Sequence, residues 1–257
     1  MNTCIYDQEL VGGYKSNSQK ARVLSENWYV HNMYCPCCLN KSVKKFPNNT
    51  EVSDFYCEKC NNRFESKSSS KSFSKRVVDG EYQTMIKVIS SDLVPNFFLM
   101  HYSTEDWYVK NLFLIPNFFM TPSIIEKRNA LADSARRHGW IGCNILIDNI
   151  PDEGKIHIVK NEEEIDKEKV NHIYRKMIFL KSKDPKFRGW TLDVLRCVQD
   201  IDKTDFVLSD IYAFNEHLKK LHPENKHIDA KIRQQLQILR DNGILKFNNH
   251  GMYSINR

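Results

Sequence analysis

Hydrophobic residues recur along the chain at two kinds of spacing, which divide it into a mixed α/β region and a helical region after it. In the first region, apolar side chains repeat at intervals of three and four residues in several segments, which predicts helices. Short runs rich in β-branched and aromatic residues predict strands, the first two of them neighbours in a sheet. The predicted helices cover residues 18–30, 82–89 and 170–178, and the predicted strands cover residues 97–102, 112–115 and 156–159. A Ser/Lys tract over 68–74 predicts a loop.

The pattern changes after a polar segment, residues 181–189, which we interpret as a linker. Three helical stripes follow, with Thr191 and Ser209 in capping positions of the first two and Gly243 at the end of the third. The predicted helices cover 192–201, 211–221 and 228–239, and two alternating strands over 244–247 and 252–255 are joined by a turn at 248–251. Three helices and a β-hairpin are the order of a winged-helix domain. The predicted domains are residues 1–180 and residues 190–257.

The composition is that of a globular protein with a sizeable core. Of 257 residues, 41% are apolar and 11% aromatic, so one medium and one small folded domain fit the length. The net charge of +6 fits either a nucleic-acid partner or an ordinary solvated basic surface. The mean hydropathy is −0.55 and no apolar run reaches membrane-spanning length, so we expect no contact with a membrane. From the polar start of the sequence we expect no secretory leader, and the eight cysteines then favour a reducing cytoplasm and thiolate–metal chemistry.

Two cysteine pairs, Cys35/Cys38 and Cys57/Cys60, follow the pattern C-x2-C-x18-C-x2-C. Each pair supplies two thiolates from a tight turn, and this spacing is typical of a Zn²⁺ site. Four thiolates leave no position for water, so we expect a structural Zn²⁺ in a ribbon over about 34–61. The alternative is a set of independent buried cysteines. The other cysteines, which we expect to be buried free thiols, are Cys4, Cys37, Cys143 and Cys197, and of these Cys37 could compete for the metal.

An acid and an acid-x-base triplet flank the second cysteine pair. Asp54 precedes it, and Glu65 and Lys67 follow it. If the cysteine turn is the tip of a hairpin, antiparallel strands return Glu65 and Lys67 toward Asp54, and alternation places both on one face. Two facing carboxylates repel unless a cation lies between them, and hard oxygen ligands suit Mg²⁺. The pattern predicts a metal-dependent phosphodiesterase centre; the alternative is a zinc ribbon with ordinary solvated charges.

The third helix of the C-terminal region presents Arg and Gln side chains away from its apolar stripe. These side chains can make bidentate contacts to guanine and adenine edges in a major groove. The alternatives are a solvated helix face or a surface for protein contacts. The candidate DNA contacts on this helix are Lys231, Arg233, Gln234, Gln237 and Arg240.

A second basic cluster runs through Arg136, Arg137 and His138 to Trp140. The arginines could neutralise phosphates while Trp140 stacks on bases. The alternative is a core tryptophan beside a surface arginine pair.

Several long motifs, spread over nearly the whole chain, allow comparison with known families. They are Tyr14-Lys-Ser-Asn-Ser-Gln-Lys-Ala-Arg22, Asp54-Phe-Tyr-Cys57, Phe64-Glu65-Ser-Lys67, Gly139-Trp-Ile-Gly-Cys143-Asn144, Arg188-Gly-Trp190-Thr191 and the stretch from Lys231 to Asp241. In these motifs the chain closely resembles the methyl-directed type II restriction endonucleases of the DpnI family. The resemblance implies a PD-(D/E)xK nuclease core with an inserted zinc ribbon, followed by a C-terminal winged helix.

The resemblance also implies Mg²⁺-dependent cleavage of double-stranded DNA at GATC sites with N6-methylated adenine. By position, Asp54 and Glu65 hold the metal with the backbone carbonyl of Ser66, and Lys67 is the catalytic base or orients the water. Trp140 then lies at the DNA. The family triplet usually has an apolar middle residue, so Ser66 is a departure from the pattern.

The sequence therefore predicts a cytoplasmic type II restriction endonuclease that acts on methylated DNA, as a monomer without an obligate protein partner. Two alternatives stay open. One is a zinc-ribbon and winged-helix regulator without catalysis, and the other is a nuclease that reads a different site or modification.

Overall fold

The structure is a computed structural model that describes residues 5–47, 50, 53–91, 93–248 and 251–256. The chain forms two compact units, each assembled from three stretches of sequence. The first contains Met1–Lys75, Ser91–Met120 and Asp152–Met177, and the second contains Arg76–Ser90, Thr121–Pro151 and Ile178–Arg257. The domain boundaries inferred from the sequence stay a prediction.

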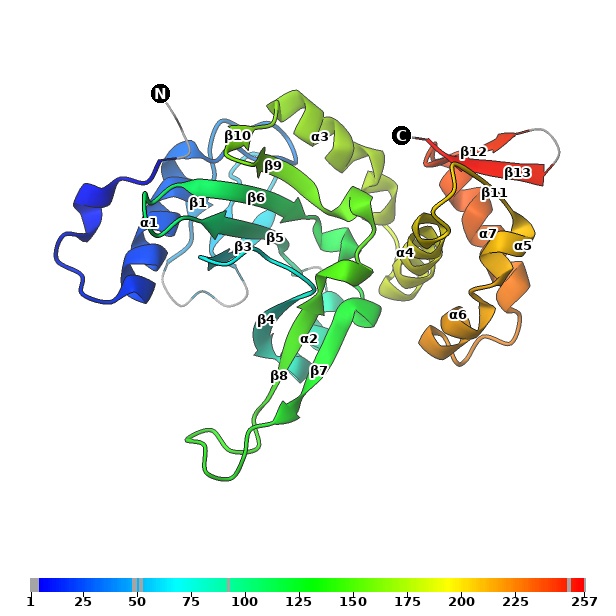
Figure 1. Cartoon of the computed structure of the whole chain (residues 1–257), viewed down its shortest axis with the longest axis horizontal. Helices are drawn as coiled ribbons and strands as arrows, with labels where there is room; N and C mark the ends of the chain where they lie inside the picture. The colour runs from blue at the N-terminus through cyan, green and yellow to red at the C-terminus, as the bar shows by residue number, and fades with distance from the viewer. Residues whose placement is uncertain (1–4, 48–49, 51–52, 92, 249–250, 257) are drawn as a thin grey trace. The chain divides into compact units, whose positions relative to one another are not determined.

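A seven-stranded sheet forms the centre of the first unit (Figure 1). Its order is β1-β2-β3-β5-β6-β9-β10, with antiparallel neighbours except for the parallel pair β3 and β5. The strands are β1 (Lys44–Lys45), β2 (Phe55–Tyr56), β3 (Arg63–Ser69), β5 (Asn96–Tyr102), β6 (Val109–Ile115), β9 (Ile156–Lys160) and β10 (Glu163–Glu164). The helices of this unit are η1 (Gln8–Val11), α1 (Asn17–Asn32), η2 (Asn117–Phe119), η5 (Asp152–Gly154) and α3 (Lys167–Lys176). The mixed α/β class is confirmed.

Helix α1 contacts β1 and β3. The apolar stripe that predicted it is buried, with Ala21, Leu24 and Trp28 all in the core. Tyr29 is fully buried and stacks on Phe98 of β5 with ring centroids 5.2 Å apart. Aromatic pairs of this kind add about 0.5–1.5 kcal/mol beyond area burial. The helix is thereby anchored over the face of the sheet that carries Phe98.

Strands β2 and β3 form the antiparallel hairpin expected around the second cysteine pair, with Phe55 opposite Phe64. Strand β3 continues to Ser69, which pairs with His101 of the parallel strand β5. The loop predicted over 68–74 was therefore wrong at its start. Polar side chains suggested a loop, but pairing with β5 gives the backbone of Ser69 a place in the sheet.

Helix α3 packs against β9. Val170 and Tyr174 are buried, and the ring of Tyr174 lies 5.4 Å from that of Phe118. The Asn171 side chain donates a 2.7 Å hydrogen bond to the carbonyl of Pro36. This bond ties α3 to the turn that holds the first cysteine pair.

The second unit contains an antiparallel three-stranded sheet in the order β4-β8-β7. Its strands are β4 (Arg76–Glu81), β7 (Ile125–Ala130) and β8 (Ile141–Leu146), and α2 (Tyr82–Ile89) contacts all three. The nearby short helices are η3 (Pro122–Ile124), η4 (Ile147–Asn149) and η6 (Ile178–Leu180). Hydrophobic periodicity predicted α2 but not these strands, because β7 buries only Ile125 and shows no alternation.

The C-terminal part of the second unit has the predicted winged-helix order. Its strands pair antiparallel in the order β11-β13-β12. The elements are α4 (Pro185–Asp200), β11 (Asp205–Val207), α5 (Leu208–Tyr212), α6 (Asn215–Leu221), α7 (Ile228–Asp241), β12 (Leu245–Asn248) and β13 (Met252–Ile255). Gly243 follows α7 with a positive φ of 70°, as expected of a residue that ends a helix.

Helix α4 begins earlier than predicted, inside the segment interpreted as a linker. The Asp184 carboxylate accepts a 2.9 Å hydrogen bond from the Phe187 N–H, and Pro185 occupies the first turn. Asp followed by Pro is a helix start, and the sequence interpretation of these residues as a linker overlooked it. Thr191 is consequently not a cap but a fully buried residue within the helix.

The helix predicted over 211–221 is two helices, α5 and α6, and Ser209 lies inside α5 instead of capping it. The first turn of α5 is stabilised instead by Asp210, whose carboxylate accepts a hydrogen bond from the Val207 N–H. Asn249 and His250 of the predicted turn, and Cys4, lie outside the described residues. Within the described residues, no helix combines the length and apolar character needed to cross a membrane.

Candidate active site and metal centre

Asp54, directly before β2, is held by four hydrogen bonds. Its N–H donates to the Phe64 carbonyl at 2.9 Å, and its own carbonyl accepts from the Phe46 N–H at 2.8 Å. Its side-chain Oδ2 accepts from the Ser66 N–H at 2.8 Å and from the Ser66 hydroxyl at 2.9 Å. The carboxylate therefore takes the place of a strand partner for β3, against the peptide that joins Glu65 to Ser66.

Strand β3 presents the predicted triplet with alternating directions. Phe64 stacks on Phe98, the residue that also contacts α1, with centroids 4.8 Å apart. Because side chains alternate along a strand, Ser66 projects toward the α1 side and Glu65 and Lys67 project from the other face. Lys67 forms an ion pair with Glu65, and both side chains are largely buried. Their placement on one face agrees with the sequence prediction.

The peptide groups of β3 also point to alternate edges. The Phe64 carbonyl and the Ser66 N–H both bond to Asp54, so these two residues present their peptide groups to the same edge of the strand. In a strand the N–H and C=O of one residue point the same way. The Ser66 carbonyl therefore faces the edge of β3 where the Asp54 carboxylate lies.

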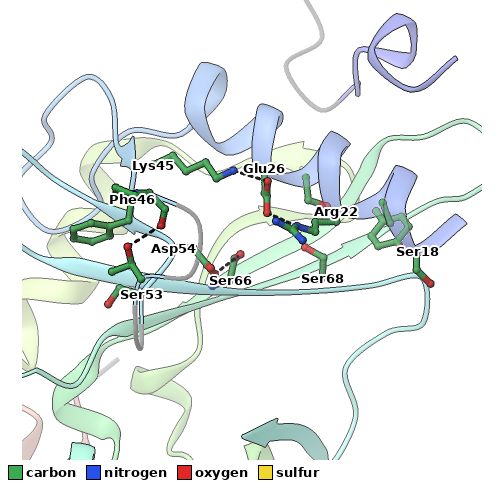
Figure 2. Close-up of a pocket in the computed structure, with 14 residues that line it drawn as sticks. Ser18, Arg22, Glu26, Lys45, Phe46, Ser53, Asp54, Ser66 and Ser68 are labelled. Carbon is green, nitrogen blue, oxygen red and sulfur yellow. Dashed lines mark hydrogen bonds and ion pairs between the residues drawn. The ribbon is translucent and has the colours of Figure 1, made fainter. Parts of the chain in front are cut away.

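A cavity of about 540 Å³ lies between α1 and this edge of the sheet (Figure 2). Asp54 and Ser66 line it from the sheet, and Arg22 and Glu26 line it from α1. Glu26 bonds to Arg22 and to Lys45, each at 2.8 Å. Burial raises the pKa of Glu26, but the hydrogen bonds from Lys45 and Arg22 outweigh it and hold the pKa below its ordinary value. The cavity is thus lined by alternating charges of both signs.

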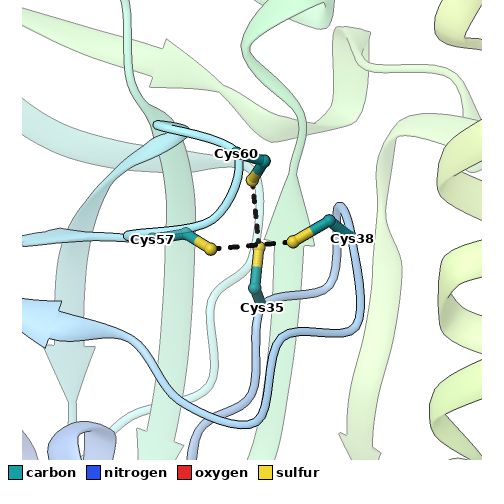
Figure 3. Close-up of side chains that lie close together, drawn as sticks. All are labelled: Cys35, Cys38, Cys57 and Cys60. Atoms are coloured by element: carbon teal, nitrogen blue, oxygen red, sulfur yellow. Dashed lines mark hydrogen bonds between the residues drawn. The ribbon is translucent and has the colours of Figure 1, made fainter.

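The four predicted zinc ligands converge on one point (Figure 3). Their sulfur atoms all lie within 4.8 Å of one another, and Cys35–Cys60 and Cys38–Cys57 are each 3.6 Å apart. Tetrahedral Zn–S bonds of about 2.3 Å place sulfur atoms about 3.8 Å apart. The cluster therefore has the spacing that a Zn²⁺ ion needs.

The two cysteine turns share one hydrogen-bond pattern. The Leu39 N–H donates to the Cys35 carbonyl at 2.8 Å, and the Asn61 N–H donates to the Cys57 carbonyl at 2.9 Å. Leu39 and Asn61 both have positive φ, at 61° and 55°. The second turn is closed by the Cys57 N–H, which donates to the Asn62 carbonyl at 3.0 Å. This closure sets the register of the β2–β3 hairpin.

The thiol of Cys60 is the most easily ionised of the cluster. Burial raises its pKa, but hydrogen bonds, first among them the 3.1 Å bond from the Asn62 side chain, lower it to about 7. A thiolate at neutral pH is the form that binds zinc. From the sequence, Cys37 was a possible competing ligand for the metal. It does not belong to the four-cysteine cluster and is buried beside Tyr174.

The candidate DNA contacts of the C-terminal region lie along α7. Arg233, Gln234, Gln237 and Arg240 are exposed, whereas Ile232, Leu236 and Leu239 are buried. The Arg233 guanidinium donates to the Tyr212 hydroxyl, Lys231 donates to Gln234, and Arg240 pairs with Asp241. The polar face predicted for this helix is therefore exposed and partly preordered.

Trp140 lies at the end of the β7–β8 hairpin. The tip closes through a 2.9 Å bond from the Leu131 N–H to the Trp140 carbonyl, and Gly139 adopts a positive φ of 74°. Arg137 lies over the indole, with its guanidinium carbon 4.8 Å from the ring centre. Arg136 is exposed on the same tip, and the indole of Trp140 is half-buried. Trp140 is therefore not the core tryptophan of the alternative interpretation.

Comparison with known families agrees with this geometry. Residues 1–183 match DpnI, the Dam-replacing family, and residues 186–255 match DpnI_C, the Dam-replacing HTH domain. The first match covers more than half of the chain. The chain belongs to the DpnI family. Membership of the DpnI family supports a restriction nuclease of the DpnI type, and the HTH domain supports DNA binding.

Some residues of this DpnI-family site were missed from the sequence. Glu26 and Lys45 were not singled out, although Arg22 and Glu26 have the i, i+4 spacing of a helical ion pair. Their approach to Asp54 depends on how α1 packs, which local spacing does not encode. The bond from Ser66 to Asp54 was also missed, because the interpretation treated Ser66 only as a backbone ligand.

Proposed function

We propose that this DpnI-family protein is a type II restriction endonuclease that hydrolyses double-stranded DNA at GATC sites with N6-methylated adenine. The observation that carries the proposal is the position of Asp54, bonded to the peptide between Glu65 and Ser66. This hydrogen bond connects Asp54 to the Glu65-Ser66-Lys67 triplet, in a chain that also has an HTH domain. An acid bonded to the strand that also carries Glu65 and Lys67 supplies the kinds of group that metal-dependent phosphodiester hydrolysis uses.

We assign a catalytic Mg²⁺ to the carboxylates of Asp54 and Glu65 and to the carbonyl of Ser66. These are hard oxygen donors, as Mg²⁺ prefers, and Ser66 bonds only one of the two Asp54 carboxylate oxygens. When bound, Mg²⁺ would polarise the scissile phosphate and lower the pKa of the attacking water. The Cys35, Cys38, Cys57 and Cys60 cluster would hold a structural Zn²⁺.

Lys67 is the proposed base or water-orienting residue. It leaves β3 on the same face as Glu65 and forms an ion pair with it. In this position its ammonium group offsets the negative charge of Glu65 before DNA binds and that of the phosphate during hydrolysis.

The proposed DNA contacts combine phosphate binding with base recognition. Arg136, Arg137 and Trp140 of the β7–β8 hairpin, and Arg233 and Gln237 of α7, supply charge, a stacking surface and base-reading groups. A buried methyl group contributes about 0.8 kcal/mol, so methyl groups read by more than one domain would give useful discrimination. We propose that a monomer acts in the cytoplasm.

Replacing Asp54 with Ala separates this function from that of a DNA-binding regulator. The nuclease should lose cleavage of methylated DNA by several orders of magnitude, because one of two metal carboxylates is missing, and it should still bind the duplex. Cleavage assays with Mg²⁺ and gel-shift assays without metal measure the two properties separately. Equal behaviour of the Asp54→Ala variant and the wild type in both assays would support the regulator instead.

A further inference from the structure

The indole of Trp140 packs against Gly142 of strand β8. Trp140 and Gly142 are two residues apart, so they project from the same face of the hairpin. A Cβ atom at Gly142 would lie 2.7 Å from Cζ3 and 2.8 Å from Cη2 of Trp140. The outer edge of the indole therefore fills the space that any other residue at 142 would occupy.

One guanidinium group lies over this indole and a second lies beside Gly142. Arg137 lies over the ring at 4.8 Å, and Nη1 of Arg128 lies 3.4 Å from the position of a Cβ at Gly142. Among the residues that the structure describes, no carboxylate forms an ion pair with either arginine. Within the described part of the chain, the two guanidinium groups are therefore not engaged in ion pairs.

This part of the hairpin has no core of its own that would explain the arrangement. From Lys127 to Ala130 strand β7 is exposed, and Trp140 is only half-buried. A half-buried tryptophan at the hairpin end, with Arg137 over its ring and Arg128 beside Gly142, offers a flat surface with two cations nearby. Such surfaces stack on bases and bind phosphates.

We propose that Gly142 is a positioning residue that leaves room for the indole of Trp140, and that the side chains of Trp140, Arg137 and Arg128 form a preorganised DNA-binding platform. The inference rests on the proposed function, in that the ligand is duplex DNA. It adds Gly142 and Arg128 to the interface and gives each a role. Gly142 sets the orientation of the ring, and Arg128 binds a phosphate or a base edge beside it.

The test is the Gly142→Ala variant, with Gly80→Ala as its matched control. Gly80 lies in β4 of the same sheet, has no positive φ, and a Cβ there meets nothing within 4 Å. The Gly142→Ala protein should fold, because the clash is with the movable outer edge of a side chain. The emission of Trp140 is obtained by subtracting the emission of a Trp140→Leu variant. In Gly142→Ala this emission should shift in wavelength, and acrylamide should quench it more strongly. Gly80→Ala should match the wild type.

The second readout is affinity for a methylated GATC duplex, measured without divalent metal. Loss of base stacking predicts that Gly142→Ala binds about ten-fold more weakly or worse, while Gly80→Ala binds like the wild type. Arg128→Ala should weaken binding several-fold more than Lys127→Ala, which removes the same charge from a residue that lies over Tyr82 instead.

Each outcome decides the proposal. Unchanged Trp140 fluorescence in Gly142→Ala would show that Gly142 does not position the ring. Changed fluorescence with unchanged affinity would show that the ring is not part of a DNA-binding platform, even if cleavage by the wild type is confirmed. If the wild-type protein bound no duplex at all, the proposed function would fail and the platform with it, whereas the fluorescence comparison would still report on the packing.

Discussion

At the scale of single residues, Asp54 and Ser66 are the pair on which the proposed chemistry depends. Ser66 bonds Asp54 through both its N–H and its hydroxyl. The hydroxyl replaces the apolar side chain that is usual at this position of the triplet in related enzymes. The Asp54 carboxylate, which we propose binds the metal, is therefore held by one hydrogen bond more than the backbone alone would supply. The consequence should appear in the metal requirement.

The Ser66→Ala variant removes the hydroxyl bond and keeps the backbone bond to Asp54. A hydrogen bond to a charged group contributes about 1.5–3 kcal/mol when buried and less in an open cavity, so roughly a five-fold loss of metal affinity is expected. The Mg²⁺ concentration for half-maximal cleavage and the binding of Mn²⁺ in the absence of DNA should both shift. Ser68→Ala is the control, because Ser68 lines the same cavity without a bond to Asp54. Identical metal dependence in the two variants would contradict this role for Ser66.

The residues of the candidate site were predictable only in part. Spacing alone pointed to Asp54, Glu65 and Lys67, since the cysteine turn made a hairpin necessary and alternation fixed the face of the triplet. It did not reveal that the Asp54 side chain bonds to β3 in place of a strand partner, or that Trp140 rests on Gly142. Both depend on the local register of the backbone, which no residue pattern specifies.

At the scale of elements, the second cysteine turn closes the β2–β3 hairpin that carries Asp54 and Glu65, and the first is bonded to α3. The Cys57 N–H closes the β2–β3 turn, and the register from this turn places Asp54 beside β3. Asn171 of α3 binds the carbonyl of Pro36 in the other turn. The cysteine cluster is thus connected to both the hairpin and α3.

Replacement of Cys57 by Ala should abolish cleavage through loss of structure. With three thiolates left, the protein should lose its bound zinc, unfold at a lower temperature and aggregate more readily. Cys37→Ala is the matched control, since Cys37 lies in the same cluster region but outside the four ligands. It should retain one zinc per chain. Zinc analysis and thermal unfolding measure both effects, and a Cys57→Ala protein with a full zinc content would show that this cysteine is not a ligand.

Helices α4 and α7 are joined by a buried polar contact. The hydroxyl of Thr191 lies 2.7 Å from Oε1 of Gln235, and both residues are fully buried. Thr191→Val keeps the shape but leaves the Gln235 amide without this partner. The free energy of unfolding should fall by about 1–3 kcal/mol. Thr191→Ser, which keeps the hydroxyl, should lose less. Urea unfolding measures the difference, and equal losses in the two variants would show that the hydrogen bond contributes nothing.

Helices with a regular apolar stripe were predicted well, and short exposed strands were not. Helix α1 buries its apolar stripe, and helices α2, α3 and α7 each bury part of the stripe that predicted them. Strands β4, β7 and β8 were missed because their stability comes from pairing with one another and from α2, and β7 keeps charged residues on both faces. Asp184 and Pro185 marked the start of α4, but a polar composition suggested a linker.

At the scale of the whole molecule, the chain combines a candidate catalytic centre in one unit with DNA-binding surfaces in the other. The Asp54–Ser66 edge and the cysteine cluster belong to the first unit, and Trp140 and α7 belong to the second. The net charge of +6 favours a polyanionic ligand for such a chain. If the proposed function holds, we expect cleavage to require both units and binding to DNA to require only the second.

The most direct test is cleavage of two plasmids that differ only in adenine methylation at GATC. Purified, zinc-loaded protein with Mg²⁺ should cut the methylated plasmid into the fragments that its GATC sites define and leave the unmethylated plasmid intact. Omission of Mg²⁺ should stop the reaction. An intact methylated plasmid, with protein shown to be folded, would contradict the account, as would equal cleavage of both plasmids.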